Sequence, residues 1–396
     1  MNIKAWIKKY TMVIALVVVF IFFAFLTDGR LLNPQNVSNL LLQNAYVLVM
    51  ACGMLLCILT GGNVDLSVGS TLCLSAALSA KMMQMGQSPV TAILVSMAVG
   101  IVIGALQGYL IGYVHIPPFI CTLGGMFLYR GFARVVLDSK TIAVSDNRYI
   151  NLFASYIQIP SIDRIGAVDA KGNNLPNQFY SALILGIVIA VVVTVMTVLN
   201  RIKQKKQGYN VANPVGVYVK LVIIDVLIIA YSYMLMNYKG IPVMLIWILA
   251  IVLIFAFITS STVFGRYFYA VGGNEKATKL SGIDPRLVYF VAYFLMSVLA
   301  AFSGLLMASR IGSVDGNMGN SFEMDAIASC FIGGASAYGG SGTVPGIMIG
   351  AILLGVINQG MSIYGLSDMW QYVVKGAVLL AAVIFDVVSN HKTGKS

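Results

Sequence analysis

The stretch Gly265–Arg286, GRYFYAVGGNEKATKLSGIDPR, is the polar segment around which the whole chain is organised. It passes through two glycines to Asn274, continues as EKATKL and reaches Gly282. Asn is a preferred N-cap, an acid in the first turn and a base in the last turn complement the helix dipole, and Gly commonly ends a helix. The pattern predicts a short capped helix between two apolar spans, exposed for a soluble partner to grip. An ordinary solvated loop is the alternative.

The composition on either side of this segment is that of an integral membrane protein. Hydrophobic residues make up 59% of the 396 residues, charged residues only 10%, and the mean hydropathy is +0.88. Soluble domains carry about 25% charged residues. The net charge of +11 does not indicate nucleic-acid binding, because the basic residues form no stripe and sit between apolar runs instead.

Apolar runs of spanning length divide the chain into about twelve predicted membrane spans. The first follows the basic segment Met1–Tyr10 and reaches Leu26; without a cleavage site it reads as an uncleaved span. Two spans, 66–85 and 325–344, are rich in Gly and Ser and are expected to be short or broken helices. The remaining spans are 37–59, 90–114, 117–137, 179–199, 217–237, 241–261, 287–308, 345–366 and 368–388.

The basic residues orient these spans. If the N-terminus is inside, fourteen of the 25 Lys and Arg residues fall in inner segments and eight in outer loops. Lys171 is one of these outer bases, and Asp169 and most other loop acids also lie outside. This positive-inside bias predicts that both termini and the segment 265–286 face the cytoplasm.

The two ends of the chain show a weak internal repeat. NVDLS from Asn63 and EMDAI from Glu323 each open a Gly/Ser-rich span, and each is followed by a Gly-striped helix ending in Gln-Gly. In the predicted topology the two units have opposite orientations, the inverted-repeat layout of many transporters. We therefore expect an all-α polytopic membrane protein. Its predicted parts are a single transmembrane domain 1–396 with a first repeat 37–137, a large outer loop 138–178, intervening spans with extra helices 179–261, a cytoplasmic loop 262–286 and a second repeat 287–388.

Glycines recur every four residues from Gly100 to Gly112, which places them on one helix face, and Gly346 and Gly350 repeat the spacing. Such faces allow close helix packing in lipid. The glycines of 333–342 lack the Lys of a phosphate-binding loop, and the terminal Gly394–Ser396 has no helix after it, so nucleotide binding is not indicated.

Polar residues at membrane depth are the candidates for a pathway or gate. Asp65 and Asp325 either cap the helices that they open or line a polar path. The span amides either contact sugar hydroxyls, beside aromatic side chains, or join helices. The candidate pathway residues are Asn44, Asn63, Asp65, Phe119, Asp325, Asn358 and Trp370. Asp225 and Lys375 are isolated span charges, and the sequence offers no catalytic or metal-binding constellation.

Four segments resemble the permease subunit of bacterial ABC importers for monosaccharides, the ribose, galactose and xylose group. They are TGGNVDLSVGS (60–70), IPPFICTLGGMFLYRG (116–131), FGRYFYAVGGNEKATKLSGI (264–283) and EMDAIASCFIGGASAYGGSGTVPG (323–346). Together they cover both halves. Around 200–245 the chain is similar to the longer xylose or multiple-sugar branch.

The resemblance implies a bacterial inner-membrane protein that moves a monosaccharide by alternating access. Its implied partners are ABC ATPase subunits, a periplasmic sugar-binding protein and a second permease copy, in contact with membrane lipid and without nucleic acid. ATP and Mg²⁺ would be used by the ATPase, with no cofactor in this chain. The implied coupling residues are Gly273, Asn274, Glu275, Lys276, Ala277, Leu280 and Gly282. An ion-coupled secondary sugar transporter and a membrane enzyme are the rival interpretations.

Overall fold

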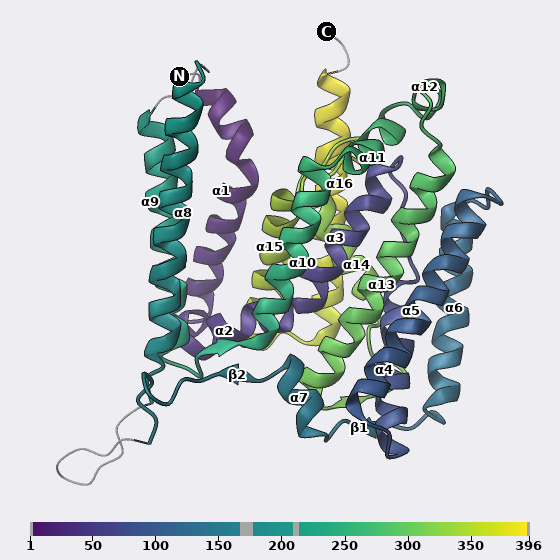
Figure 1. Cartoon of the computed structure of the whole chain (residues 1–396), viewed down its shortest axis with the longest axis horizontal. Coiled ribbons are helices and arrows are strands. Elements are labelled where there is room, and N and C mark those ends of the chain that lie inside the picture. Colours follow the sequence, from purple (N-terminus) through teal and green to yellow (C-terminus); the bar gives the residue numbers. More distant parts are fainter. Residues whose placement is uncertain (1–2, 167–176, 209–213, 394–396) are drawn as a thin grey trace. The chain divides into compact units, whose positions relative to one another are not determined.

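The computed structural model describes residues 3–166, 177–208 and 214–393, and these are mostly helical (Figure 1). Part of the predicted outer loop, with Asp169 and Lys171, and the tail Gly394–Ser396 lie outside the described residues. The chain divides into two compact units. The larger unit contains residues 1–28, 40–155 and 244–396, and the smaller unit contains residues 29–39 and 156–243.

Two helices form the centre of the larger unit, α3 (Ala45–Leu59) and α13 (Pro285–Ile311). Every residue of α3 is buried, as expected for a helix that is apolar all round. Helix α13 contacts α3 and also α4 (Val68–Gln84) and α5 (Pro89–Gly112). Helix α3 in turn contacts α14 (Phe322–Ile332) and α15 (Val344–Tyr364).

The outer helices of this unit each pack on one inner helix. Helix α1 (Ile3–Leu26) contacts α15, α6 (Pro118–Val136) contacts α4, and α16 (Asp368–Thr393) contacts α14. Many apolar side chains on α6 and α10 (Val243–Ser261) are exposed. In a membrane protein such surfaces face lipid or a neighbouring subunit.

The larger unit has two distinct ends (Figure 1). At one end lie α11 (Val263–Gly273) and α12 (Glu275–Leu280), together with the start of α1 and the end of α16. At the other end lie α7 (Asn147–Phe153) and the strand β1 (Ile142–Ala143). β1 pairs antiparallel with β4 (Ser313–Val314), with Ile142 opposite Val314 and Ala143 opposite Ser313.

The glycine face of α5 packs directly on the backbone of α13, which confirms the predicted packing role. A Cβ added at Gly104 would lie 2.7 Å from the carbonyl oxygen of Phe294, and one at Gly108 would lie 2.6 Å from that of Phe290. Real Cβ atoms do not approach a carbonyl oxygen so closely, so only glycine fits this contact. Small residues let helix backbones touch where lipid supplies no hydrophobic drive.

Two predicted spans are not single helices. The span 37–59 is interrupted at Asn44, between α2 (Pro34–Gln43) and α3, where the Asn44 amide donates to the Leu40 carbonyl at 2.6 Å. The expectation of a short or broken helix in 325–344 is confirmed, because α14 ends at Ile332 and residues 333–343 form a loop. Gly334 adopts a φ of +86° there, and the Ala335 amide folds back to the Cys330 carbonyl at 2.9 Å. By contrast, α4 runs unbroken through the Gly/Ser-rich stretch.

The smaller unit is a helical hairpin with a short sheet. Helices α8 (Tyr180–Lys206) and α9 (Pro214–Met236) pack together, and Thr194 donates a hydrogen bond to Asp225 at 2.6 Å. Asp225 is therefore not an isolated charge. The strands β2 (Tyr156–Ile157) and β3 (Ile241–Pro242) pair antiparallel, and the 3₁₀ helix Arg30–Leu32 belongs to the same unit.

Among the described residues, eight helices are long and apolar enough to cross a membrane. They correspond to α2 with α3 and to α5, α6, α8, α9, α10, α13 and α15. The apolar described part of α1, Met12–Leu26, is shorter than these eight helices. Helices α4, α14 and α16 lie in the other predicted spans and are not among the eight. An all-helical, multi-span architecture is thus confirmed, whereas twelve crossings remain a prediction.

Substituting Gly104 tests the packing of α5 on α13. We expect Gly104→Leu to cost more than the about 1–3 kcal/mol typical of overpacking, because the side chain would meet backbone that cannot rotate away. The matched control is Gly131→Leu on α6, where an added Cβ meets nothing within 4 Å. Thermal unfolding and membrane yield of both purified variants provide the measurement. Equal stability of the two variants would contradict the packing argument.

Candidate functional site

Helix α12 has the caps that its sequence predicts. The Asn274 side chain accepts a hydrogen bond from the Ala277 amide at 2.9 Å at the start of the helix. Gly282 follows the last turn with a φ of +86°, and its amide donates to the Lys279 carbonyl at 3.1 Å. Glycine occupies this left-handed conformation without steric cost. The prediction of a short helix with an Asn cap and a Gly stop is confirmed.

The chain leaves α12 through a second fixed point at the start of α13. The Asp284 carboxylate accepts from the Arg286 amide at 3.1 Å and pairs with the Arg286 guanidinium at the same distance. The hydrogen bond from the Arg286 side chain lowers the pKa of Asp284, so this carboxyl stays ionised at neutral pH. Segment 274–286 is therefore held at both ends by its own side chains.

One face of α12 is anchored and the rest is exposed. Thr278 is 6% exposed, and its hydroxyl donates to the Asn274 carbonyl at 2.8 Å. Leu280 is 90% exposed, more than any other large apolar side chain among the described residues. Tyr289 donates to the Glu275 carboxylate at 3.1 Å. All seven predicted coupling residues are exposed: Gly273, Asn274, Glu275, Lys276, Ala277, Leu280 and Gly282.

Helix α11 meets two loops through glycine backbone. A Cβ on Gly272 would overlap the Leu59 carbonyl oxygen, and the Gly340 amide donates to that same oxygen at 3.0 Å. Tyr269 adds a hydrogen bond to the Gly342 carbonyl at 2.9 Å. We call residues 59–62, 269–273 and 337–342 the glycine junction.

The two loops of the glycine junction also touch each other. A Cβ on Gly62 would overlap the Ala337 carbonyl oxygen, and a Cβ on Gly339 would lie 2.5 Å from the Cα of Gly61. The first loop leads from α3 to α4, and the second leads from α14 to α15. The element that carries α12 is thus in backbone contact with both predicted repeats.

Asp65 acts first as a local cap. One carboxylate oxygen accepts from the Ser67 amide at 2.8 Å and from the Ser67 hydroxyl at 2.7 Å, just before α4 begins. Ser67 in turn accepts from the Gln107 amide at 2.8 Å, and Ser297 donates to Gln107 at 3.1 Å. This chain ties the start of α4 to α5 and α13. The second Asp65 oxygen has no hydrogen-bond partner among the described residues.

Asp325 does not cap its helix. It lies within α14, is 2% exposed, and accepts from the Tyr46 hydroxyl at 2.7 Å and from the Lys375 ammonium at 3.1 Å. Tyr46 also stacks on Phe322, with ring centroids 3.6 Å apart. Lys375 is therefore neither isolated nor an interfacial side chain, since it pairs with Asp325 and joins α16 to α14.

The other predicted pathway residues lie apart from one another. Asn44 is buried against the Gly355 backbone, and the Asn63 amide donates to its own loop at Thr60, 3.3 Å away. Phe119 and Trp370 are 58% and 60% exposed on α6 and α16. Asn358 is part-buried on α15. The two cavities described next are lined by none of the seven pathway candidates, so their role in a pathway stays a prediction.

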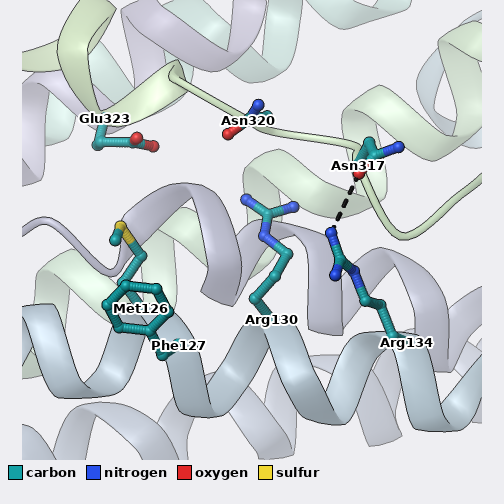
Figure 2. Close-up of a pocket in the computed structure, with 7 residues that line it drawn as sticks. All are labelled: Met126, Phe127, Arg130, Arg134, Asn317, Asn320 and Glu323. Atoms are coloured by element: carbon teal, nitrogen blue, oxygen red, sulfur yellow. Dashed lines mark hydrogen bonds between the residues drawn. The ribbon is translucent and has the colours of Figure 1, made fainter.

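Two adjoining cavities open at the end opposite α12, with volumes of about 160 and 350 Å³. Figure 2 shows Arg130 and Arg134 of α6 pointing towards Asn317, Asn320 and Glu323. Asn317 and Asn320 line both cavities. The sequence analysis missed this cluster.

Two sequence signals point to the cluster in retrospect. Arg130 and Arg134 are four residues apart, so they share a helix face near the outer end of a predicted span. The amide-rich segment DGNMGN, from Asp315 to Asn320, follows another predicted outward-going span, 287–308. Nothing in the sequence alone shows that the two segments face each other.

Comparison with known proteins was made for the whole chain. It is 30% identical to the xylose transport system permease protein of Escherichia coli K12, over 98% of this chain and 93% of that protein. It is 29% identical to the ribose import permease protein of the same organism, over 97% of this chain and 95% of that protein. The galactose/methyl galactoside import permease protein of Haemophilus influenzae is 30% identical, over 92% of this chain and 90% of that protein. No solved structure matches the chain.

These relatives are permease subunits of transport systems, not catalytic enzymes, and they match the chain almost from end to end. A family model matches residues 36–383, which include both central helices, the glycine junction, α12 and the two cavities. The chain therefore belongs to the family described as the permease component of the branched-chain amino acid transport system.

Proposed function

We propose that this chain is the membrane permease of an ATP-driven importer that carries a monosaccharide, xylose-like or one of several sugars, across the bacterial inner membrane. Near-complete coverage of the relatives named for xylose, ribose and galactose carries this proposal. The family description names branched-chain amino acids, but these full-length relatives are sugar permeases. The apolar helices agree with a multi-pass membrane protein.

The partners follow from this role. A permease that does not itself hydrolyse ATP needs ATPase subunits on the cytoplasmic face. It also needs a sugar-binding protein on the outer face. The exposed α12, with Leu280 at its tip and Lys276 and Lys279 on its surface, suits a groove on an ATPase. The exposed apolar faces of α6 and α10 suit lipid and a second copy of the permease.

The orientation belongs to the same proposal. With α12 on the cytoplasmic side, α1 starts and α16 ends at that side too (Figure 1), which agrees with the positive-inside bias. The two cavities then face outwards.

Inverted repeats are supported by the way the helices pack. The first repeat would consist of α2 with α3, α4, α5 and α6, and the second of α13, α14, α15 and α16. Helix α13 contacts α4 and α5, just as α3 contacts α14 and α15. Likewise α6 packs on α4, as α16 packs on α14. This reciprocal packing supports twelve crossings related by a pseudo-two-fold axis in the membrane plane.

The glycine junction gives the proposed coupling a physical route. Movement of the ATPases on ATP would push on α12, and α11 would pass the displacement to the loops of both repeats. Backbone atoms in direct contact cannot slide past one another without breaking the hydrogen bond from Gly340 to Leu59. The two repeats would therefore move together, as alternating access requires.

Uptake measurements test the energy source and the substrate. The permease is purified with its soluble subunits, reconstituted in liposomes, and given labelled D-xylose, D-ribose, D-galactose or L-leucine. We expect uptake of at least one sugar that requires ATP and the binding protein and that persists with a protonophore and a sodium ionophore. Uptake that proceeds without ATP and stops with either ionophore would establish the rival ion-coupled transporter, and ATP-driven uptake of leucine alone would overturn the sugar assignment.

Leu280 tests the coupling role of α12. Because its side chain is 90% exposed, Leu280→Glu should leave folding unchanged while placing a charge in an apolar contact. We expect ATP-driven uptake and sugar-stimulated ATP hydrolysis to fall by about tenfold, equivalent to about 1.4 kcal/mol of lost coupling. The matched control is Met85→Glu, an equally apolar side chain that is 66% exposed at the other end of the larger unit. Normal uptake by Leu280→Glu would refute the role of α12.

A further inference from the structure

We propose that the two adjoining cavities beside Arg130 and Asn320 form a monosaccharide-binding subsite on the permease itself, selective for a neutral sugar. This inference rests on the proposed function of the chain as a sugar permease. It assigns to the permease a share of the sugar recognition that would otherwise belong to the external binding protein alone.

The cavities offer both hydrogen-bond donors and hydrogen-bond acceptors (Figure 2). The Arg134 guanidinium donates to the side-chain amide oxygen Oδ1 of Asn317 at 3.3 Å, which leaves the side-chain NH₂ group of Asn317 able to donate. The Asn320 side chain makes no hydrogen bond with the other residues drawn in Figure 2, so its amide oxygen and its NH₂ group are available to a ligand. Glu323, 8% exposed at the edge of the same cavity, adds carboxylate acceptors.

The site is fixed before any ligand arrives. Arg130 donates from one nitrogen to the carbonyls of Gly316, at 3.4 Å, and Met318. A guanidinium has five N–H donors, so others remain for a ligand. The Asp315 carboxylate accepts a hydrogen bond from the backbone N–H of Asn317 at 2.8 Å, and the preceding strand β4 is paired with β1. The loop 315–320 is thus held by α6, by its own turn and by a strand, which lowers the entropic cost of binding.

Aromatic rings supply the apolar surface that a sugar ring needs. Phe322 lines the larger cavity and is held in place by its stacking on Tyr46. Tyr372 of α16 lines the same cavity with a 56% exposed ring, and Phe127 of α6 lines the smaller one. Small-molecule sites combine such surfaces with a few placed polar groups, in volumes from about 300 Å³ upwards. The larger cavity, about 350 Å³, is at the lower end of that range, as suits a small ligand.

The charge balance favours a neutral ligand over an anionic one. Arg130 and Arg134 alone would attract a phosphate or a carboxylate. However, Glu323 and Asp315 bring two negative charges to the same cavities. A hydroxyl can donate to a carboxylate and accept from a guanidinium or an amide, so a neutral polyol satisfies both kinds of group. An anion would be repelled by the carboxylates that it could not contact favourably.

Direct binding to the purified full-length permease, in lipid nanodiscs and without the binding protein, tests the inference. Saturation-transfer NMR with D-xylose, D-ribose and D-galactose reports weak binding, and D-gluconate and inorganic phosphate serve as anionic competitors. We expect a neutral sugar to bind, and Asn320→Ala to weaken its affinity by about tenfold, since a site built to hydrogen-bond hydroxyls depends strongly on each partner. The matched control is Gln87→Ala, an exposed amide outside the cavities, which should bind as the wild type does.

Each other outcome overturns the proposal. Equal sugar affinity of Asn320→Ala and the wild type excludes this site, and stronger displacement of the sugar by gluconate or phosphate makes it an anion site. If Asn320→Ala fails to fold, Tyr372→Ala, at an exposed ring, replaces it with the same expected loss. ATP-driven sugar uptake by the complete importer, with no sugar binding to the wild-type permease alone, would refute the subsite and leave the proposed function standing. Absence of both sugar uptake by the complete importer and sugar binding by the permease would refute both the proposed function and the subsite.

Discussion

The backbone contact at the glycine junction constrains the rest of this structure. The Leu59 carbonyl accepts a hydrogen bond from the Gly340 amide, and the Cα of Gly272 packs on the same carbonyl. Three segments that are far apart in the sequence therefore share one peptide group. A side chain on Gly272 would separate them, so the contact fixes the position of α11, and α11 in turn fixes where α12 projects. Close contact between backbones transmits displacement because neither partner can rotate out of the way.

The remainder of the larger unit follows the same rule with different residues. Glycine contacts join α5 to α13, where Gly104 meets Phe294, and join α15 to α14, where Gly350 meets the Ser329 carbonyl. Each pair belongs to one repeat or links the two through a central helix. Side chains add hydrogen bonds and ion pairs between helices, among them the contacts of the buried Asp325 with Tyr46 and Lys375.

Much of this could be predicted from local sequence. The length of the apolar runs predicts the membrane spans, and the distribution of Lys and Arg predicts their orientation. Asn274 and Gly282 predict the two ends of α12, because capping signals act within a few residues. The break at Asn44 could not be predicted, since one amide in an apolar run fits a continuous helix equally well. The break after α14 is different, because the Gly/Ser-rich composition of 325–344 indicates a short or broken helix, although it does not show that the helix ends at Ile332.

The pathway candidates failed to converge for a further reason. A polar residue in a span has several possible partners, and the sequence does not say which helix lies beside it. Asp325 and Lys375 are fifty positions apart, and Arg130 lies almost two hundred positions before Asn320. Pairing such residues requires the tertiary packing, which the one-dimensional pattern does not contain.

The two ends of the larger unit are built from different groups, backbone at one end and side chains at the other, and this difference fits the roles proposed for them. The junction beside α12 consists of glycine backbone, which tolerates no adjustment and suits the transfer of force. The cavities at the other end are lined by polar side chains, such as Arg134 and Asn320, which offer hydrogen-bonding groups to a ligand. In the proposed importer, the backbone contacts at one end would respond to the ATPase, and the side chains at the other end would contact related sugars. Evolution can then vary the side chains of the cavities without disturbing the backbone contacts through which α12 would act.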